Sequence, residues 1–145
     1  MTKLIMVFIA VFGAVLVETA ENQRYKQIKT AGDALRTCMR NLGDLPLYVY
    51  EHGAYKNIKE EDKDHIGEVY LCVYTKLGIM TEDGDLIDDK LHTFFINLLG
   101  DAKPDRDSRK ETIEKILKTC KPSQCLVPKI KAFSYERCIR NDIFY

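Results

Sequence analysis

The five cysteines of this chain, together with the apolar segment that precedes them, limit its fold more than any other feature of the sequence. The apolar segment covers residues 4–17 and follows a single basic residue, Lys3. A basic start and an apolar core of this length are typical of a secretion signal peptide, and the core is too short to span a bilayer comfortably. We therefore expect residues 1–20 to be a signal peptide, cut after Thr19 or Ala20, with a membrane anchor as the alternative.

The remainder of the chain has the size and charge of one ordinary domain. Removing the signal leaves about 125 residues, which is typical of a single domain, so we expect one domain over residues 21–145. Basic and acidic residues balance to a formal net charge of zero. A chain without a basic excess has no general attraction for phosphates, so we expect neither nucleic acid nor a membrane as a partner. The expected location is secreted and extracellular.

The number of cysteines is odd, and this matters in a secreted chain. A secreted domain of this size is expected to form disulfides. Four cysteines can pair, and the fifth then forms a bridge between chains or remains a free thiol. The cysteines are Cys38, Cys72, Cys120, Cys125 and Cys138.

Apolar residues recur three to four positions apart along most of the chain after residue 22, which predicts a succession of about six helices. Gly43, Gly78 and Gly100 mark expected helix ends. Residues 45–50 are the best strand candidate, but no neighbouring segment offers a partner strand. We therefore expect an all-α domain.

Local signals mark three of the expected helix starts. Asn57 with Glu60, and Ser108 with Glu111, have the spacing of a capping box, in which two side chains satisfy backbone amides reciprocally. Pro128 suits the first turn of the last helix, because proline lacks the amide that this turn leaves unpaired.

Two segments around the second cysteine indicate a family. Residues 67–72 (GEVYLC) are followed by residues 76–80 (KLGIM) and then by an acidic glycine turn. In this pattern, and in the placing of its cysteines, the chain resembles the insect odorant-binding proteins of the pheromone/general-odorant-binding family. Members are small, secreted, six-helix proteins with six cysteines. The resemblance covers nearly the whole chain after the signal.

The resemblance implies which cysteines pair. Cys38, Cys72, Cys120 and Cys138 match the family's first, third, fourth and sixth cysteines, which implies the disulfides Cys38–Cys72 and Cys120–Cys138. From the lengths of the loops that they close, the two are expected to stabilise the fold by about 4 and about 3 kcal/mol. Cys125 matches no family position, so we expect a free thiol or the bridge of a homodimer.

The two family cysteines that are absent leave an acid and a base in their places. Glu68 stands at the second position and Lys129 at the fifth, so the chain is similar to the subgroup that lacks both. We hypothesise that the two side chains form an ion pair, although two unrelated surface charges are the alternative. An exposed pair holds far less firmly than a disulfide, so the last helix is expected to be less firmly held.

The family resemblance implies a non-enzymatic carrier, without a cofactor, that holds a small hydrophobic ligand such as an odorant or pheromone. The ligand would lie in an apolar cavity enclosed by the helices, where burial supplies about 25 cal/mol per Å² of apolar surface. The candidate ligand-binding residues lie on apolar stripes, and for each of them ordinary core packing is the alternative. They are Val69, Val73, Leu91, Phe94, Phe95, Leu98, Ile113, Leu117, Ile130, Phe133, Tyr135 and Phe144.

A few polar groups are expected to orient such a ligand. Tyr70, Tyr74 and Tyr135 each carry a hydroxyl that either meets the ligand or bonds to the protein. Phe144 and Tyr145 at the C-terminus either fold back as a lid or end the chain as a frayed tail.

The remaining polar residues predict no metal or catalytic site. His52, His65 and His92 lack metal-ligand spacing, and we expect them in solvent, with His92 as a candidate pH-sensitive latch. Residues 83–85 (DGD) lack the glycine and the distal acid of a calcium loop. Nucleophile-elbow, phosphate-loop and HExxH motifs are absent from the sequence.

A second function on the same scaffold stays open. A salivary, venom or reproductive-fluid protein could scavenge host amines or lipids, or act through protein contacts. Capturing an amine requires a buried carboxylate near aromatic rings. Glu68, or Asp88 and Asp89 near Phe94 and Phe95, are the candidates.

Overall fold

The computed structural model describes residues 2–99 and 106–143, and these residues form helices and turns with no strand longer than an isolated bridge. The all-α prediction is therefore confirmed, although the described residues contain five α-helices, fewer than expected. Their bounds are α1 Thr2–Leu42, α2 Lys63–Lys76, α3 Asp88–Leu99, α4 Arg106–Thr119 and α5 Pro128–Ile143.

The segment between α1 and α2 contains short 3-10 helices, and the first of them occupies the residues that were the best strand candidate. They are η1 Leu47–Tyr50, η2 Ala54–Lys56 and η3 Glu60–Asp62. Pro46 precedes η1 in an extended conformation, and Gly53 precedes η2 with φ at 78°. These two residues divide the segment into pieces too short for an α-helix to propagate.

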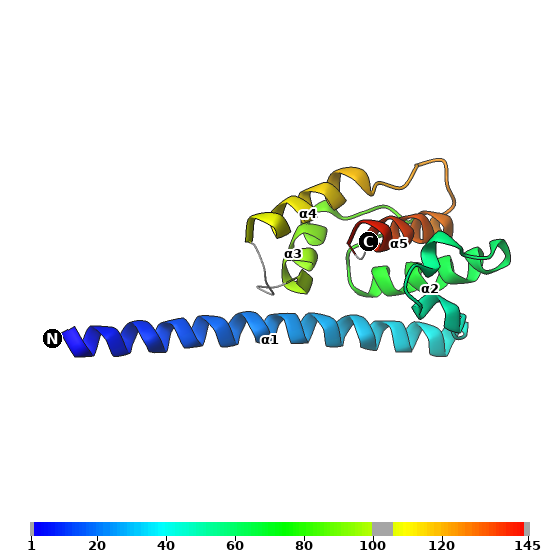
Figure 1. Cartoon of the computed structure of the whole chain (residues 1–145). Helices are drawn as coiled ribbons and strands as arrows, with labels where there is room; N and C mark the ends of the chain where they lie inside the picture. Colours follow the sequence, from blue (N-terminus) through cyan, green and yellow to red (C-terminus); the bar gives the residue numbers. More distant parts are fainter. Residues whose placement is uncertain (1, 100–105, 144–145) are drawn as a thin grey trace.

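Helix α1 begins much earlier than predicted, at Thr2 instead of after residue 22. Residues 2–22 contain no proline, the residue that stops a helix most effectively, so the helix continues through them. Figure 1 shows α1 as a long straight helix whose C-terminal half lies alongside the other helices and whose N-terminal half extends past them.

Both predicted capping boxes are wrong. No side chain caps α2, which follows η3 directly and begins at Lys63, while Asn57 ends η2. Three acidic residues in η3 stand immediately before α2, and their charge favours the positive end of its dipole without a cap. Helix α4 begins at Arg106, so Ser108 lies inside its first turn.

Buried side chains from all five helices form one core. Cys38 and Ala34 enter it from α1, and the α2–α3 connection adds Ile79 and Met80. Helices α2 and α5 share the most extensive contact of any helix pair among the described residues. The largest fully buried side chains are Tyr135, Phe95, Ile66, Ile79, Met80, Leu91 and Ile116.

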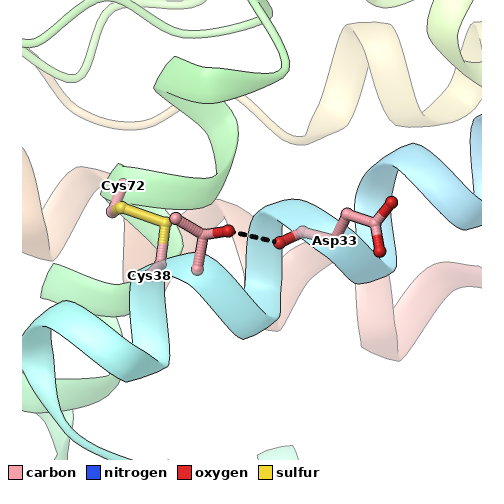
Figure 2. Close-up of a disulfide and its surroundings, with 4 residues drawn as sticks. Asp33, Cys38 and Cys72 are labelled. Atoms are coloured by element: carbon pink, nitrogen blue, oxygen red, sulfur yellow. Dashed lines mark hydrogen bonds between the residues drawn. A yellow bond between two sulfur atoms is a disulfide. The ribbon is translucent and has the colours of Figure 1, made fainter.

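Two disulfides link the helices in the pairing that the family resemblance implied. Cys38 of α1 is joined to Cys72 of α2 (Figure 2). Cys120, directly after α4, is joined to Cys138 of α5. Near the first bridge, the Thr37 hydroxyl donates to the Asp33 carbonyl at 2.9 Å, a bond within α1. The predicted disulfides are therefore confirmed.

The connection between α2 and α3 is a tight turn that packs on the start of α5. Gly78, with φ at 73°, ends α2 as predicted, and Pro128 begins α5 as predicted. An isolated antiparallel bridge between Met80 and Leu86 closes the acidic turn. At Gly84 a Cβ would lie 3.0 Å from backbone atoms of Pro128, so this position requires glycine both for its φ of 80° and for space.

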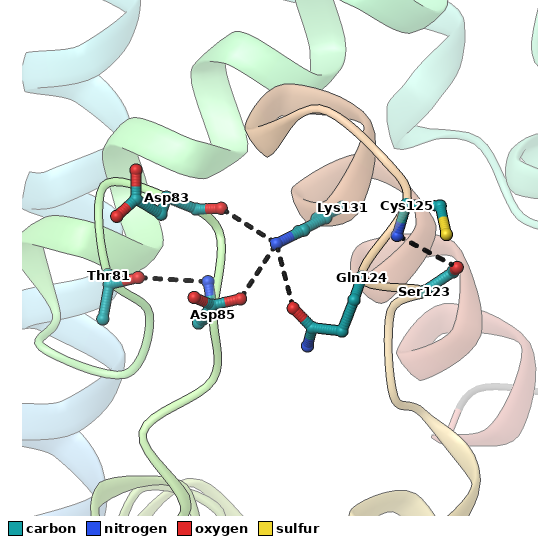
Figure 3. A network of polar contacts seen from close by, with 7 residues as sticks. All are labelled: Thr81, Asp83, Asp85, Ser123, Gln124, Cys125 and Lys131. Carbon is teal, nitrogen blue, oxygen red and sulfur yellow. Dashed lines mark hydrogen bonds and ion pairs between the residues drawn. The ribbon is translucent and has the colours of Figure 1, made fainter.

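One buried lysine ties this turn to the loop before α5 (Figure 3). The ammonium group of Lys131 donates to the Asp83 carbonyl at 3.2 Å and pairs with the Asp85 carboxylate at 2.9 Å. It also donates to the Gln124 side-chain carbonyl at 3.4 Å. Cys125, next to Gln124, is an exposed free thiol.

Candidate functional site

Helices α2 and α5 meet without a disulfide, along a contact that we call the α2–α5 seam. At one end of the seam the backbones approach closely, because a Cβ on Gly67 would lie 2.2 Å from the carbonyl oxygen of Lys129. Only glycine leaves room for this approach. The residues of the seam are Gly67, Glu68, Tyr70 and Tyr74 of α2 and Lys129, Glu136 and Arg140 of α5.

The predicted ion pair between Glu68 and Lys129 is present at this end of the seam, with an additional partner. The Lys129 ammonium lies 3.5 Å from the Glu68 carboxylate and 2.9 Å from that of Asp64. The hydrogen bond with Asp64 raises the pKa of Lys129. Sequence reasoning missed Asp64, although Asp64 and Glu68 stand four residues apart on one helix face.

A buried polar network occupies the other end of the seam. The hydroxyl of Tyr74 donates to one oxygen of the Glu136 carboxylate, and the Arg140 guanidinium donates to the other at 2.6 Å. Arg140 also donates to the Tyr70 hydroxyl at 3.4 Å. Glu136 is only 5% exposed, so its charge depends on these partners. A glutamate four residues before an arginine was the sequence signal for this network.

The network shifts the ionisation of its tyrosines. Burial raises the pKa of Tyr74 well above its ordinary value, and the nearby Glu136 carboxylate raises it further. Burial and then Glu136 likewise raise the pKa of Tyr70. Both hydroxyls therefore remain protonated and act as neutral hydrogen-bonding groups.

Tyr135, the residue before Glu136 on α5, differs from these two tyrosines. Its ring packs edge-on against Tyr74, with ring centroids 5.6 Å apart. The side chain is 1% exposed, and its hydroxyl has no hydrogen-bond partner. The hydroxyl of Tyr55 on η2 has no hydrogen bond of ordinary geometry, but it lies near the Tyr70 hydroxyl, and the Arg140 guanidinium lies over the Tyr55 ring, 5.5 Å from its centroid.

Most of the candidate ligand-binding residues converge in or on the core. Phe94, Leu98 and Leu117 pack against it and are partly buried, and Ile130 is half-buried. Phe144, like its neighbour Tyr145 in the expected lid, lies outside the described residues. The buried candidates are Val69, Val73, Leu91, Phe95, Ile113, Phe133 and Tyr135.

A cleft of about 400 Å³ lies beside this core, open to solvent, between α1, the end of α2 and α3. Leu77, Ile79 and Phe94 form its apolar side. Phe94 packs edge-on against the buried Phe95, so the cleft adjoins the core directly. Apart from Phe94 the sequence did not point to the cleft, because its walls come from three separated segments. The remaining lining residues are Gln27, Asp89, Lys90, Thr93 and Asn97.

The carboxylates that were candidates for capturing an amine do not meet the requirement of burial. Asp88, Asp89 and Glu68 are exposed. Glu136 is buried among tyrosines, but Tyr74 and Arg140 already occupy both of its oxygens. Among the described residues, therefore, none of the named acids offers a buried carboxylate to an amine.

The histidines have different surroundings. His92 and His52 are exposed, as expected. His65 is not free in solvent, because its ring is half-buried and bonds to the Asp44 carbonyl at 2.9 Å, linking α2 to the loop after α1. Among the described residues, no group of histidine, cysteine and acidic residues is arranged to hold a metal ion. Over the same residues, no helix has the length and apolar character that crossing a membrane requires.

Comparison with known proteins identifies the family. The sequence matches the PBP/GOBP family over residues 20–142. No curated protein and no solved structure gives a significant match. The match includes all five helices in whole or in part and both disulfides. The chain therefore belongs to the PBP/GOBP family, the insect odorant- and pheromone-binding proteins, which is a family of carriers.

Proposed function

We propose that this protein is a secreted, non-enzymatic carrier that holds a small hydrophobic ligand in an apolar interior formed by α2, α3, α4 and α5. Membership in a family of carriers supports the general activity. The signal-like residues 1–20 support secretion. The candidate residues of the four helices share one core, which supports an interior site.

The observation that carries the proposal is the cleft beside α3. Its volume of about 400 Å³ lies in the range of small-molecule sites. Its lining is mostly polar, but Phe94 on its wall packs against the buried Phe95 and so connects the cleft to the core. We propose that a ligand enters here, leaving water as its apolar surface contacts these side chains.

A displacement assay tests this function. The fluorescent apolar probe N-phenyl-1-naphthylamine should bind the wild-type protein with micromolar affinity, and serotonin and histamine should not displace it. The variant Phe94→Ala should weaken probe binding several-fold. Ile96→Ala, on the exposed side of the same helix, is the matched control and should leave it unchanged.

Two results would count against the carrier. If the probe does not bind to the wild-type protein, a role through protein contacts is favoured. If serotonin or histamine displaces the probe, the scavenger alternative is favoured, despite the engagement of Glu136 by Tyr74 and Arg140.

The oligomeric state depends on Cys125. Its thiol is free and exposed, which leaves it accessible to a second copy of the chain. We propose that two copies of the chain form a homodimer through a disulfide between their Cys125 residues. Measuring the intact mass under non-reducing conditions tests this. A dimer mass that disappears in Cys125→Ser supports the bridge, and a monomer mass in the wild-type protein rules it out.

A further inference from the structure

The three tyrosines that could offer a hydroxyl to a ligand are no longer equivalent once their contacts are known. Tyr74 donates to Glu136, and Tyr70 accepts from Arg140, so both take part in the α2–α5 seam. Tyr135 is only 1% exposed, and its hydroxyl has no hydrogen-bond partner. The contacts therefore leave Tyr135 as the candidate for an external partner.

A buried hydroxyl without a partner costs folding free energy, because it gives up hydrogen bonds to water and gains none in return. Tyr70 and Tyr74 avoid this cost because their hydroxyls form hydrogen bonds within the α2–α5 seam. Tyr135 lies in the core that it shares with the candidate ligand-binding residues, where the carrier function would place a ligand. The Tyr135 hydroxyl can be satisfied by a water molecule or by the ligand itself, and the two cases predict different behaviour.

We propose that the Tyr135 hydroxyl donates a hydrogen bond to the oxygen of a neutral ligand, such as an alcohol, aldehyde, ketone or ester, and so selects oxygenated ligands over hydrocarbons. This inference rests on the proposed carrier function. It names the ligand class that the function alone leaves open.

The charges around Tyr135 narrow the class further. Burial raises the pKa of this hydroxyl, and the carboxylates of Glu136 and Asp88 raise it further. The hydroxyl therefore stays protonated and can donate. The same two carboxylates would repel a ligand carboxylate, so a fatty acid is disfavoured as its anion. An ammonium ligand would lose its hydration here without a direct contact to a buried carboxylate, because both Glu136 oxygens are engaged and Asp88 is exposed.

Tyr55 provides a matched control, because it is a second buried tyrosine whose hydroxyl lacks a hydrogen bond of ordinary geometry. Its surroundings are polar, since Arg140 lies over its ring and Tyr70 contributes to raising its pKa. Tyr55 lies on η2, apart from α3 and α4. Tyr55→Phe removes the same single atom as Tyr135→Phe but should not affect ligand choice.

The experiment uses N-phenyl-1-naphthylamine displacement from the full secreted chain by a straight-chain alkane, alcohol, aldehyde and carboxylic acid of equal length. In the wild-type protein the alcohol and the aldehyde should displace the probe at concentrations about three- to tenfold lower than the alkane, the worth of one hydrogen bond. The ionised acid should be weaker than the alcohol. In Tyr135→Phe the advantage of alcohol and aldehyde should disappear, while the alkane and the probe bind as before.

Thermal unfolding in the absence of ligand shows whether the Tyr135 hydroxyl is left for a ligand or is already satisfied by a bound water molecule. If the hydroxyl is unsatisfied in the empty protein, Tyr135→Phe should melt at the same temperature as the wild type or higher. If a water satisfies it, the variant should melt at a lower temperature, and the inference is overturned.

Failure of the inference and failure of the carrier function give different results. A wild-type protein that binds no probe rejects both. Probe binding in which Tyr135→Phe affects alkane and alcohol equally, or in which Tyr55→Phe has the same effect, rejects only the role of Tyr135. Displacement by serotonin or histamine that Tyr135→Phe abolishes would instead assign the hydroxyl to an amine ligand.

Discussion

One disulfide links α1 to α2, and another links the end of α4 to α5. In contrast, α2 and α5 contact one another without a covalent bond. A disulfide acts largely by restricting the unfolded chain, so it places modest demands on the packing around it. The α2–α5 seam lacks that restriction and depends on contacts in the folded state. This explains why the seam combines a backbone contact that only glycine allows with a buried polar network.

The expectation that α5 is less firmly held than it would be with a third disulfide stays a prediction, and the contacts of the seam bear on it. The ion pair of Lys129 with Asp64 and Glu68 is on the surface, and by itself it would be a weak substitute for a disulfide. The seam also contains the close backbone packing at Gly67 and the buried network around Glu136. In this chain the missing bridge is therefore replaced along the whole seam and not only at the positions of the absent cysteines.

Removing the disulfides should have the largest effect on stability. Cys38→Ser with Cys72→Ser opens a loop with a sequence separation of 34, and Cys120→Ser with Cys138→Ser one of 18. The free energy of unfolding should fall by about 4 kcal/mol in the first case and about 3 kcal/mol in the second. Urea denaturation measures both.

Cys125→Ser is the control for the disulfide variants, because it removes a thiol that takes part in neither bridge. It should leave the unfolding free energy unchanged. A greater loss from the shorter loop than from the longer one would contradict the account based on chain entropy.

Gly67→Ala tests the backbone contact in the seam. The added Cβ must displace the Lys129 backbone, which should cost about 3 kcal/mol. Gly32→Ala in α1 is the matched control, since the nearest atom to its Cβ is the end of the Arg36 side chain at 4.0 Å. That change should stabilise the protein by about 0.5–1 kcal/mol because alanine favours a helix. Equal destabilisation by the two changes would mean that the close approach is unimportant.

Glu136→Gln tests the polar network. The variant keeps the shape of the side chain but removes the charge that Arg140 faces, so the unfolding free energy should fall by about 2 kcal/mol. Glu114→Gln, at an exposed position of α4, should change it little. Chemical denaturation measures the unfolding free energy of both variants. A network without energetic importance would give equal values.

The surface ion pairs should have the smallest effect. Asp64→Asn should lower the melting temperature slightly more than Glu68→Gln, because Asp64 is the nearer partner of Lys129. Both differences should vanish in high salt, which screens exposed charges. Melting curves at low and high ionic strength provide the measurement. An effect of Asp64→Asn that persists in high salt would show that this contact is not mainly electrostatic.

The fold was predictable from sequence where the pattern is local or repeated. Gly78 and Pro128 marked a helix end and a helix start because the backbone conformations that they favour are intrinsic to the residues. The capping boxes at Asn57 and Ser108 failed because a side chain with the right spacing caps a helix only if the helix begins there. The 3-10 helix η3, which directly precedes α2, decided where α2 begins.

The candidate site was predictable only in part. The apolar stripes of α2 and α5 placed Val69 and Phe133 in the core, since periodicity reveals which residues share a face. Periodicity does not reveal which segments lie beside each other. The cleft, which brings Gln27 of α1 to Asn97 of α3, could not be inferred for that reason.

By itself the sequence determined the helical class, the family and, through the family's cysteine positions, the two disulfides. These properties follow from short-range periodicity and from the spacing of a few residues along the chain. Only the tertiary structure decided that Asp64 shares Lys129, that Gly67 admits the backbone of α5, and that the Tyr135 hydroxyl is left without a partner. Each of these depends on atoms about sixty residues apart or more, or on the burial of a side chain, and packing in three dimensions alone determines both.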